Sequence, residues 1–141
     1  MSRRLEHAAR GGYTSEELAS QLSDEQYVEK FEHPRIAEAL QGIRYVRISL
    51  SPEVWVYLGR KEDHVLIPRL YCSCLDFLVN VVGRRRKSPC YHLVGLELAR
   101  KLGRTRDLAN LAGPRAPRIV FEILEHGFSG ELRRLVLKSQ S

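Results

Sequence analysis

Three cysteines and one histidine occur at a spacing that suits a metal ion. Cys72 and Cys74 are separated by one residue, fifteen residues follow, and Cys90 and His92 are again separated by one residue. These positions use every cysteine of the chain. Structural zinc ions are bound tetrahedrally by four thiolate or imidazole ligands, with Zn–S distances of about 2.3 Å. The spacing therefore predicts one zinc site with these four residues as its ligands.

The complete set of ligands indicates a structural site. Four protein ligands leave no position for the water or substrate that a catalytic zinc ion needs. The cysteines are also compatible with one disulfide plus a free thiol or with plain burial, and iron–sulfur clusters more usually take four cysteines. The sequence contains no nucleophile elbow, no phosphate-binding loop and no HExxH motif. We therefore expect bound zinc and no enzymatic activity.

The sequence shows neither a secretory nor a membrane-spanning pattern. The N-terminal residues contain no apolar signal segment, and no run of about 18 apolar residues occurs. Thiols in the cytoplasm stay reduced, which favours metal binding over disulfides for clustered cysteines. We expect a cytoplasmic protein, or a nuclear one if the source is a eukaryote, with no membrane contact and no small-molecule substrate.

The basic charge is concentrated around the predicted metal site. The 141 residues carry a formal net charge of +6. The segment from Arg84 to Arg118 contains ten Lys or Arg residues and two acidic residues, which gives it a local net charge of +8. The rest of the chain therefore carries a net charge of −2. This distribution suits phosphate groups as partners, and a solvated basic loop is the alternative. The predicted contacts with nucleic acid are Arg84, Arg85, Arg86, Lys87, Arg100 and Lys101.

Helix signals mark the first part of the chain. Thr14 and Ser23 each have a Glu or Gln three residues later, the sequence of a capping box. Pro34 is expected to break or restart the helix that follows Ser23, and Gly42 is well placed to end it. The sequence therefore predicts short helices up to residue 42.

A small antiparallel β-meander is predicted next. Residues 43–50 and 54–58 are rich in β-branched and aromatic residues, and a polar hairpin loop separates them from a third strand at residues 64–71. Pro68 within that strand indicates an edge or a bulge. The third strand is expected to lead directly into Cys72.

Helices are favoured for most of the remaining chain. Residues 75–82 fit a helical face, although their valines also suit a strand. Pro89 suits the entry to a helix that ends at Gly103. After a proline-containing linker, two further helices are predicted at residues 118–126 and 130–138.

The order of two strands, Cys-x-Cys, apolar segment, Cys-x-His and helix resembles the SWIM zinc finger. The similarity is strongest at residues 71–77 and 90–99, and it covers residues 43–102. The chain is similar in particular to the SWIM-domain subunit of Shu-type homologous-recombination mediator complexes. Tyr91 stands where that family commonly has a basic residue between its last two ligands.

Together the patterns predict an α+β protein made of N-terminal helices, a small antiparallel β-meander, a SWIM zinc finger of ββα-like form and C-terminal helices. We divide the chain into a flexible tail at residues 1–12, an N-terminal helical region at 13–42, the zinc-finger domain at 43–103 and a C-terminal helical arm at 104–141.

The resemblance implies a non-enzymatic adaptor in DNA repair by homologous recombination, as an archaeal counterpart of the Shu subunit. Such a protein pairs with a RecA-family recombinase paralogue and assists DNA binding or recombinase loading. Apolar residues on both faces of the strand at 54–58, and apolar stripes in the C-terminal helices, support a protein partner, although such stripes more often form an intramolecular core. The alternative is a stand-alone nucleic-acid-binding zinc-finger protein of the regulator or chromatin type.

Overall fold

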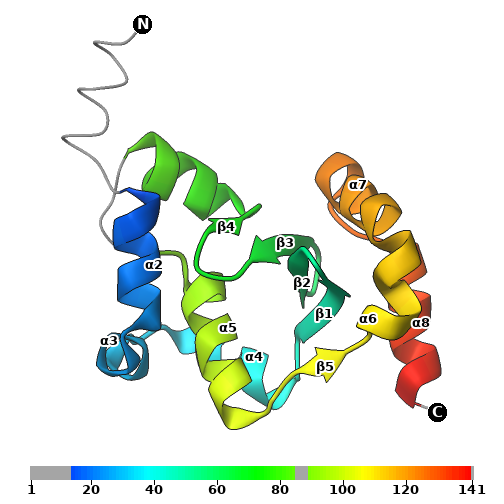
Figure 1. The fold of residues 1–141 in the computed structure, drawn as a ribbon, viewed down its shortest axis with the longest axis horizontal. Helices are drawn as coiled ribbons and strands as arrows, with labels where there is room; N and C mark the ends of the chain where they lie inside the picture. The colour runs from blue at the N-terminus through cyan, green and yellow to red at the C-terminus, as the bar shows by residue number, and fades with distance from the viewer. Residues whose placement is uncertain (1–13, 85–88, 141) are drawn as a thin grey trace, which may run out of the picture.

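The computed structural model describes residues 14–84 and 89–140 (Figure 1). Within these residues, three short helices precede the sheet: α2 (Ser15–Ser23), α3 (Glu25–Lys30) and α4 (Pro34–Gln41). Thr14 accepts a hydrogen bond from the Glu17 amide at 3.1 Å, while the Glu17 carboxylate accepts one from the Thr14 amide at 3.4 Å. The predicted capping box at Thr14 is therefore confirmed.

The starts of the next two helices depend on other side chains. The predicted capping box at Ser23 is wrong, because the N-cap of α3 is Asp24, whose carboxylate accepts bonds from the amides of residues 26 and 27. A carboxylate reaches those amides from one residue closer to the helix than Ser23. Pro34 opens α4 after His33, and Gly42 caps its end, both as predicted.

A five-stranded sheet forms the middle of the molecule. Its strands follow the order β4-β3-β2-β1-β5, and neighbours from β4 to β1 are antiparallel, whereas β5 is parallel to β1. The predicted meander is confirmed, with an added parallel strand at its edge. The strands are β1 (Tyr45–Leu50), β2 (Glu53–Leu58), β3 (Asp63–Ile67), β4 (Tyr71–Cys72) and β5 (Arg106–Asp107).

The third strand is shorter than predicted. It ends at Ile67, and the chain turns with Arg69 at φ +65° before it returns as β4, antiparallel to β3. Pro68 lies in this turn, because a proline cannot donate to the sheet. Cys72 therefore lies opposite Leu66 on a separate strand and not at the end of β3.

Helices dominate the chain after β4. Residues 75–82, where the sequence favours a helix over a strand, are helical. The predicted linker before residue 118 contains helical turns instead, and β5 and α6 were not predicted. The helical elements are η1 (Phe77–Gly83, a π-helix), α5 (Tyr91–Leu102), α6 (Ala109–Ala112), η2 (Gly113–Arg115, a 3₁₀-helix), α7 (Ala116–His126) and α8 (Gly130–Gln140).

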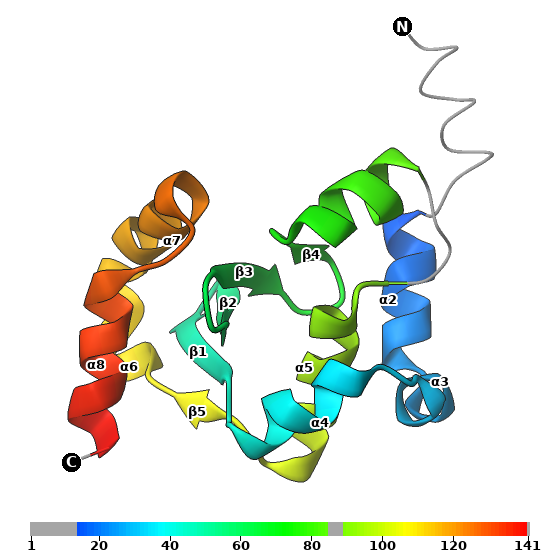
Figure 2. The same cartoon turned by 180° about the vertical axis from the view of Figure 1, so that it is seen from behind.

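Both faces of the sheet are covered by helices. Along β2, Trp55 and Tyr57 pack into one core with residues of α2 to α5 and η1, whereas Val56 and Leu58 pack into a second core with α6 to α8. Figures 1 and 2 show the sheet between these two groups of helices. A strand whose side chains are buried on both faces reads as a continuous apolar run, as β2 does. The molecule is a mixed α+β protein.

The second core changes one interpretation of the sequence. The apolar stripe of the C-terminal helices, which includes Ile119, Ile123 and Leu132, is buried against Val46 and Val56 of the sheet. These helices therefore pack on the sheet. The support that these stripes and the second strand give to a protein partner is reduced, because most of the two apolar surfaces cover each other, whereas Leu124 and Leu137 of the stripes stay exposed.

Within the described residues, no helix combines the length and the apolar character needed to cross a membrane.

Candidate metal centre

The four predicted ligands lie together in the structure. The sulfur atoms of Cys72, Cys74 and Cys90 and a ring nitrogen of His92 all lie within 4.8 Å of one another. All four side chains are buried, and the cysteines are not joined by a disulfide. Residues that are far apart in sequence thus form one cluster of the donor atoms that zinc prefers.

The Cys-x-Cys segment is held against β3 by the residue between the cysteines. The Ser73 amide donates to the Val65 carbonyl at 2.9 Å, and the Ser73 hydroxyl accepts from the Val65 amide at 2.8 Å. Together with the pairing of Cys72 and Leu66, these hydrogen bonds fix the backbone of the Cys-x-Cys segment against β3. Cys74 then receives a hydrogen bond on its sulfur from the Phe77 amide at 3.3 Å.

The other two ligands occupy the start of α5. Cys90 is the N-cap residue, and His92 lies in the first turn. The unpaired amides and the positive end of the helix dipole are found here, and both stabilise a thiolate. Pro89 precedes Cys90 as predicted for a helix entry. The cluster therefore ties α5 to β4 at the edge of the sheet.

The imidazole of His92 is held by aromatic neighbours. The Tyr57 ring lies edge-on to it at 4.5 Å between ring centres, and the His64 ring lies at 4.8 Å. The Tyr45 hydroxyl donates to the His92 carbonyl at 2.8 Å. Nδ1 of His92 is buried and has no hydrogen-bond partner among the described residues. A buried imidazole nitrogen without a partner is costly, and a metal ion bound through this nitrogen would remove that cost.

The three cysteines of the cluster differ in the direction in which their thiol pKa is shifted. Burial raises the pKa of Cys72 and that of Cys90. Hydrogen bonds from Cys72 and Cys90 hold the pKa of Cys74 well below its usual range. Without a metal, the cluster thus favours one thiolate and two thiols, whereas zinc binds all three sulfurs as thiolates. Cysteine and histidine donors at these distances fit zinc.

Zinc affinity is expected to fall as the pH falls. Because Cys72 and Cys90 keep their protons in the metal-free cluster, the zinc-bound state holds fewer protons than the metal-free state. Displacing at least two protons makes the apparent affinity change by roughly a hundredfold or more per pH unit. Competition with a chelator of known affinity between about pH 6 and pH 8 measures this dependence. An affinity that does not change over that range would contradict it.

Gly95 leaves room for the hydroxyl that positions His92. A Cβ atom at this position would overlap the Tyr45 hydroxyl oxygen and lie 3.3 Å from its Cζ atom. Tyr45 was not singled out from the sequence as a support for the ligands. A glycine in the interior of an apolar helix is the signal that the sequence offers for such a close approach.

Gly95→Ala is expected to lower the free energy of unfolding by about 1–3 kcal/mol, because the added methyl group overpacks a closed site. In a Tyr45→Phe background the same substitution should cost less, since the overlapping oxygen is gone. Urea unfolding of the zinc-loaded variants measures both effects. Equal costs in the two backgrounds would show that the Tyr45 hydroxyl is not the obstacle.

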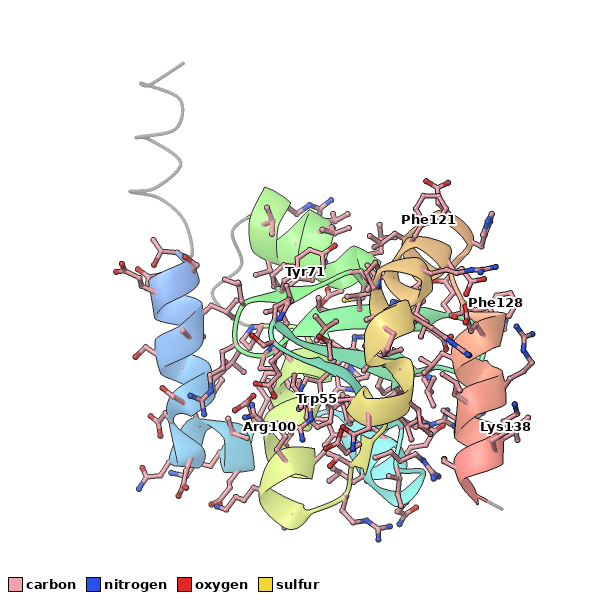
Figure 3. The ribbon with its side chains drawn as sticks, turned by 45° about the vertical axis from the view of Figure 1, so that its right-hand side comes forward. Trp55, Tyr71, Arg100, Phe121, Phe128 and Lys138 are labelled. Atoms are coloured by element: carbon pink, nitrogen blue, oxygen red, sulfur yellow. The ribbon has the colours of Figure 1, made fainter. Side chains whose placement is uncertain are left out.

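The predicted nucleic-acid contacts are spread over different surroundings. Arg84 is exposed after η1, and the predictions at Arg85, Arg86 and Lys87 lie outside the described residues. Arg100 pairs with Glu97 at 3.3 Å and lies 4.0 Å from Glu53. Figure 3 shows Arg100 beside Trp55.

Lys101 lies in an acidic neighbourhood. It pairs with Glu29 and lies 3.7 Å from Glu25 of the same helix, α3. The ion pairs at Arg100 and Lys101 partly neutralise these two cations. Their role in nucleic-acid binding stays a prediction.

Comparison with known proteins bears on this centre. The sequence model of the SWIM zinc finger matches residues 53–101. That stretch begins with β2, ends within α5 and contains all four ligands. Residues 53–101 thus carry a SWIM zinc finger, and its cluster of three cysteines and one histidine is positioned to bind zinc.

A curated relative is also similar to this chain. A protein of Archaeoglobus fulgidus, described as an uncharacterized protein, is 33% identical over 67 residues, which make up 48% of this chain and 55% of the relative. The chain thus spans about half the length of the curated relative it matches. No solved structure matches the chain.

Proposed function

We propose that the chain is a non-catalytic adaptor, organised by zinc, that pairs with a RecA-family recombinase paralogue in DNA repair by homologous recombination and assists DNA binding or recombinase loading. The observation that carries the non-catalytic part is the buried set of four protein ligands. Such a set fills the coordination sphere of zinc and leaves no position for a substrate. The resemblance to Shu-type SWIM subunits supplies the identity of the partner.

An exposed apolar surface supports a protein partner. The helical turns after the Cys-x-Cys segment are mostly apolar, with Phe77 and Val81 buried. Other apolar side chains of these turns are exposed: Leu75 is 74% exposed and Val82 is 56% exposed. Exposed apolar residues that gather on one element mark interaction sites. We name the exposed set the η1 surface, and it consists of Leu75, Leu78, Val79 and Val82.

The η1 surface continues into an apolar cavity. A cavity of about 510 Å³ lies between α2, the turn before β4 and η1, and Leu18, Leu70 and Val82 are among its lining residues. Exposed apolar residues that border such a cavity are typical of protein interaction sites. We assign this surface to the recombinase paralogue.

The proposal is tested by co-purification from native cells, with zinc measured on the same sample. A RecA-family paralogue in stoichiometric amount is expected. The double variant Leu75→Ser with Leu78→Ser should lose the paralogue, while Leu137→Ser, which changes a residue that is 66% exposed on α8, should retain it. A clean monomer, or equal capture by both variants, would contradict the pairing.

A stand-alone nucleic-acid-binding protein is the second candidate. The local charge of +8 between Arg84 and Arg118 favours it. Binding through phosphates falls steeply with salt and depends little on sequence. If the purified chain binds DNA without any partner in the cell, this function replaces the adaptor function.

A further inference from the structure

A basic cleft opens beside the metal centre. It has a volume of about 460 Å³ and lies between α4, the loop that joins β2 to β3, and the first turn of α5. That size falls in the usual range of about 300–1,000 Å³ for sites that bind small ligands. We name it the basic cleft, and the residues used below are Arg35, Arg44, Arg60, Lys61, His64 and Tyr91.

Positive charge prevails in the basic cleft. Four cationic side chains line it against two carboxylates, those of Glu38 and Glu62. Glu38 is engaged by Arg60 at 2.9 Å and by Arg44 at 3.5 Å. Arg35 and Lys61 are exposed, and no ion pair of theirs occurs among the described residues. They are the cations best able to take a negatively charged ligand.

The backbone around the basic cleft adds to the positive electrostatic potential there and fixes the shape of the cleft. Tyr91 and His92 line the cleft from the first turn of α5, so the positive end of that helix dipole faces the same space. A side chain at Gly59 would overlap the Glu62 carbonyl, so the tight loop that forms one wall requires glycine. The Arg44 guanidinium donates to the Leu58 carbonyl at 2.7 Å and holds the base of that loop.

Aromatic rings form another part of the wall. Tyr91 is partly buried between two imidazoles, with 4.1 Å between its ring centre and that of His33 and 4.0 Å to that of His92, so its edge is the part that a ligand can contact. Tyr57 and His64 lie nearly parallel at 6.3 Å. Rings beside Arg and Lys side chains suit a ligand that carries both a planar base and a phosphate group.

We infer that the basic cleft binds one nucleotide unit of a single-stranded nucleic acid, with its phosphate on Arg35 and Lys61 and its base against the edge of the Tyr91 ring. A base can enter a cleft of this size only when it is unpaired and unstacked, which excludes an intact duplex. The inference rests on the proposed function, because it assigns a site to the assistance with DNA binding.

A second cavity is lined by Arg100 and Lys101, the two described helix residues that the sequence predicts as nucleic-acid contacts. It is less suited to a phosphate group than the basic cleft. It measures about 420 Å³ and is lined by as many carboxylates as cations. Arg100 and Lys101 are paired there with Glu97 and Glu29. A balanced set of charges attracts an anion weakly, whereas the basic cleft has an excess of cations.

The test uses the full-length, zinc-loaded chain and a fluorescent oligothymidylate of about 12 nucleotides, within the usual site sizes for single strands. Fluorescence anisotropy is measured over a series of salt concentrations. Arg35→Gln with Lys61→Gln should weaken binding at least tenfold at low salt and flatten the log–log salt slope by about 0.7 for each phosphate that is no longer neutralised. Arg134→Gln with Lys138→Gln removes the same charge from α8, which packs on the face of the sheet opposite α4 and α5 (Figures 1 and 2), and should change affinity by less than about twofold.

The contact with the aromatic wall is tested by a second variant. Tyr91→Leu should weaken oligothymidylate binding by about threefold or more, because it removes an aromatic edge contact. Because Tyr91 lies between two metal ligands, one bound zinc per chain must be confirmed for this variant. Wild-type protein that does not bind the oligonucleotide, or cleft variants that bind it with unchanged affinity and slope, would overturn the inference. Binding of an acidic peptide of poly-glutamate in preference to the oligonucleotide would also overturn it.

Failure of this inference is separable from failure of the proposed function. Variants of the basic cleft should still co-purify with the recombinase paralogue, and the Leu75→Ser, Leu78→Ser variant should still bind oligothymidylate. Loss of pairing with intact oligonucleotide binding would remove the adaptor function and keep the cleft. The reverse result would remove the cleft and keep the adaptor function.

Discussion

Stripping zinc from the protein, or replacing Cys90 with alanine, is expected to unfold the part of the chain that the metal centre joins. Zinc binding supplies roughly 10–16 kcal/mol in zinc-finger peptides, as much as the whole stability of a typical domain. All three sulfurs belong to the core that α2 to α5 form with one face of the sheet. Without zinc, these buried side chains are joined only by weak hydrogen bonds, mainly to the Cys74 sulfur, which contribute far less than the metal.

Circular dichroism and hydrogen exchange measure this effect at two levels. Chelation should lower the helical signal, and the amides of α5 and β4 should lose protection first. The amides of α7 and α8 should be less affected, because the core they share with the sheet contains none of the ligands. Readdition of zinc to the chelated wild type should restore the signal, whereas Cys90→Ala should not recover. An unchanged spectrum after complete removal of the metal would refute the structural role.

The metal centre was predictable because its signal lies in residue type and spacing. Three cysteines and one histidine in Cys-x-Cys and Cys-x-His pairs leave few other chemical interpretations. The strands were predictable for a similar reason, because β-branched and aromatic runs alternate with polar turns. The residues that position the ligands were harder to predict. Tyr45 hydrogen-bonds the His92 carbonyl from 47 positions earlier in the chain, and no local sequence pattern predicts such a long-range interaction.

The misread parts of the fold involve long-range packing. Strand β5 has two residues, and it exists because Arg106 and Asp107 pair with β1, more than fifty residues away in sequence. The apolar residues on both faces of β2 suggest a partner when the sequence is read alone, because it does not reveal that α7 and α8 fold back onto the sheet. The turn at Arg69 was not predicted although Pro68 and Arg69 interrupt the apolar residues there, because Leu70 and Tyr71 resume them immediately.

A buried carboxylate joins the C-terminal helices to the loop after β2. The Asp63 side chain has no exposed surface, and it accepts hydrogen bonds from the Arg133 guanidinium and from the Ser129 amide at 3.2 Å. Arg133 also donates to the Gly59 carbonyl at 2.8 Å, and the Asp63 amide donates to the Gly127 carbonyl at 2.7 Å. Two segments more than sixty residues apart meet at this carboxylate.

Replacing Arg133 with methionine is expected to lower the free energy of unfolding by about 3 kcal/mol, because it leaves the Asp63 carboxylate buried beside an apolar side chain. This is the lower end of the usual cost, since the Arg133 side chain is 39% exposed and water can partly replace it. Arg134→Met changes the exposed neighbour on the same helix and should alter stability by less than about 0.5 kcal/mol. Urea unfolding of the zinc-loaded proteins compares the two, and equal stabilities would show that Asp63 is satisfied without Arg133.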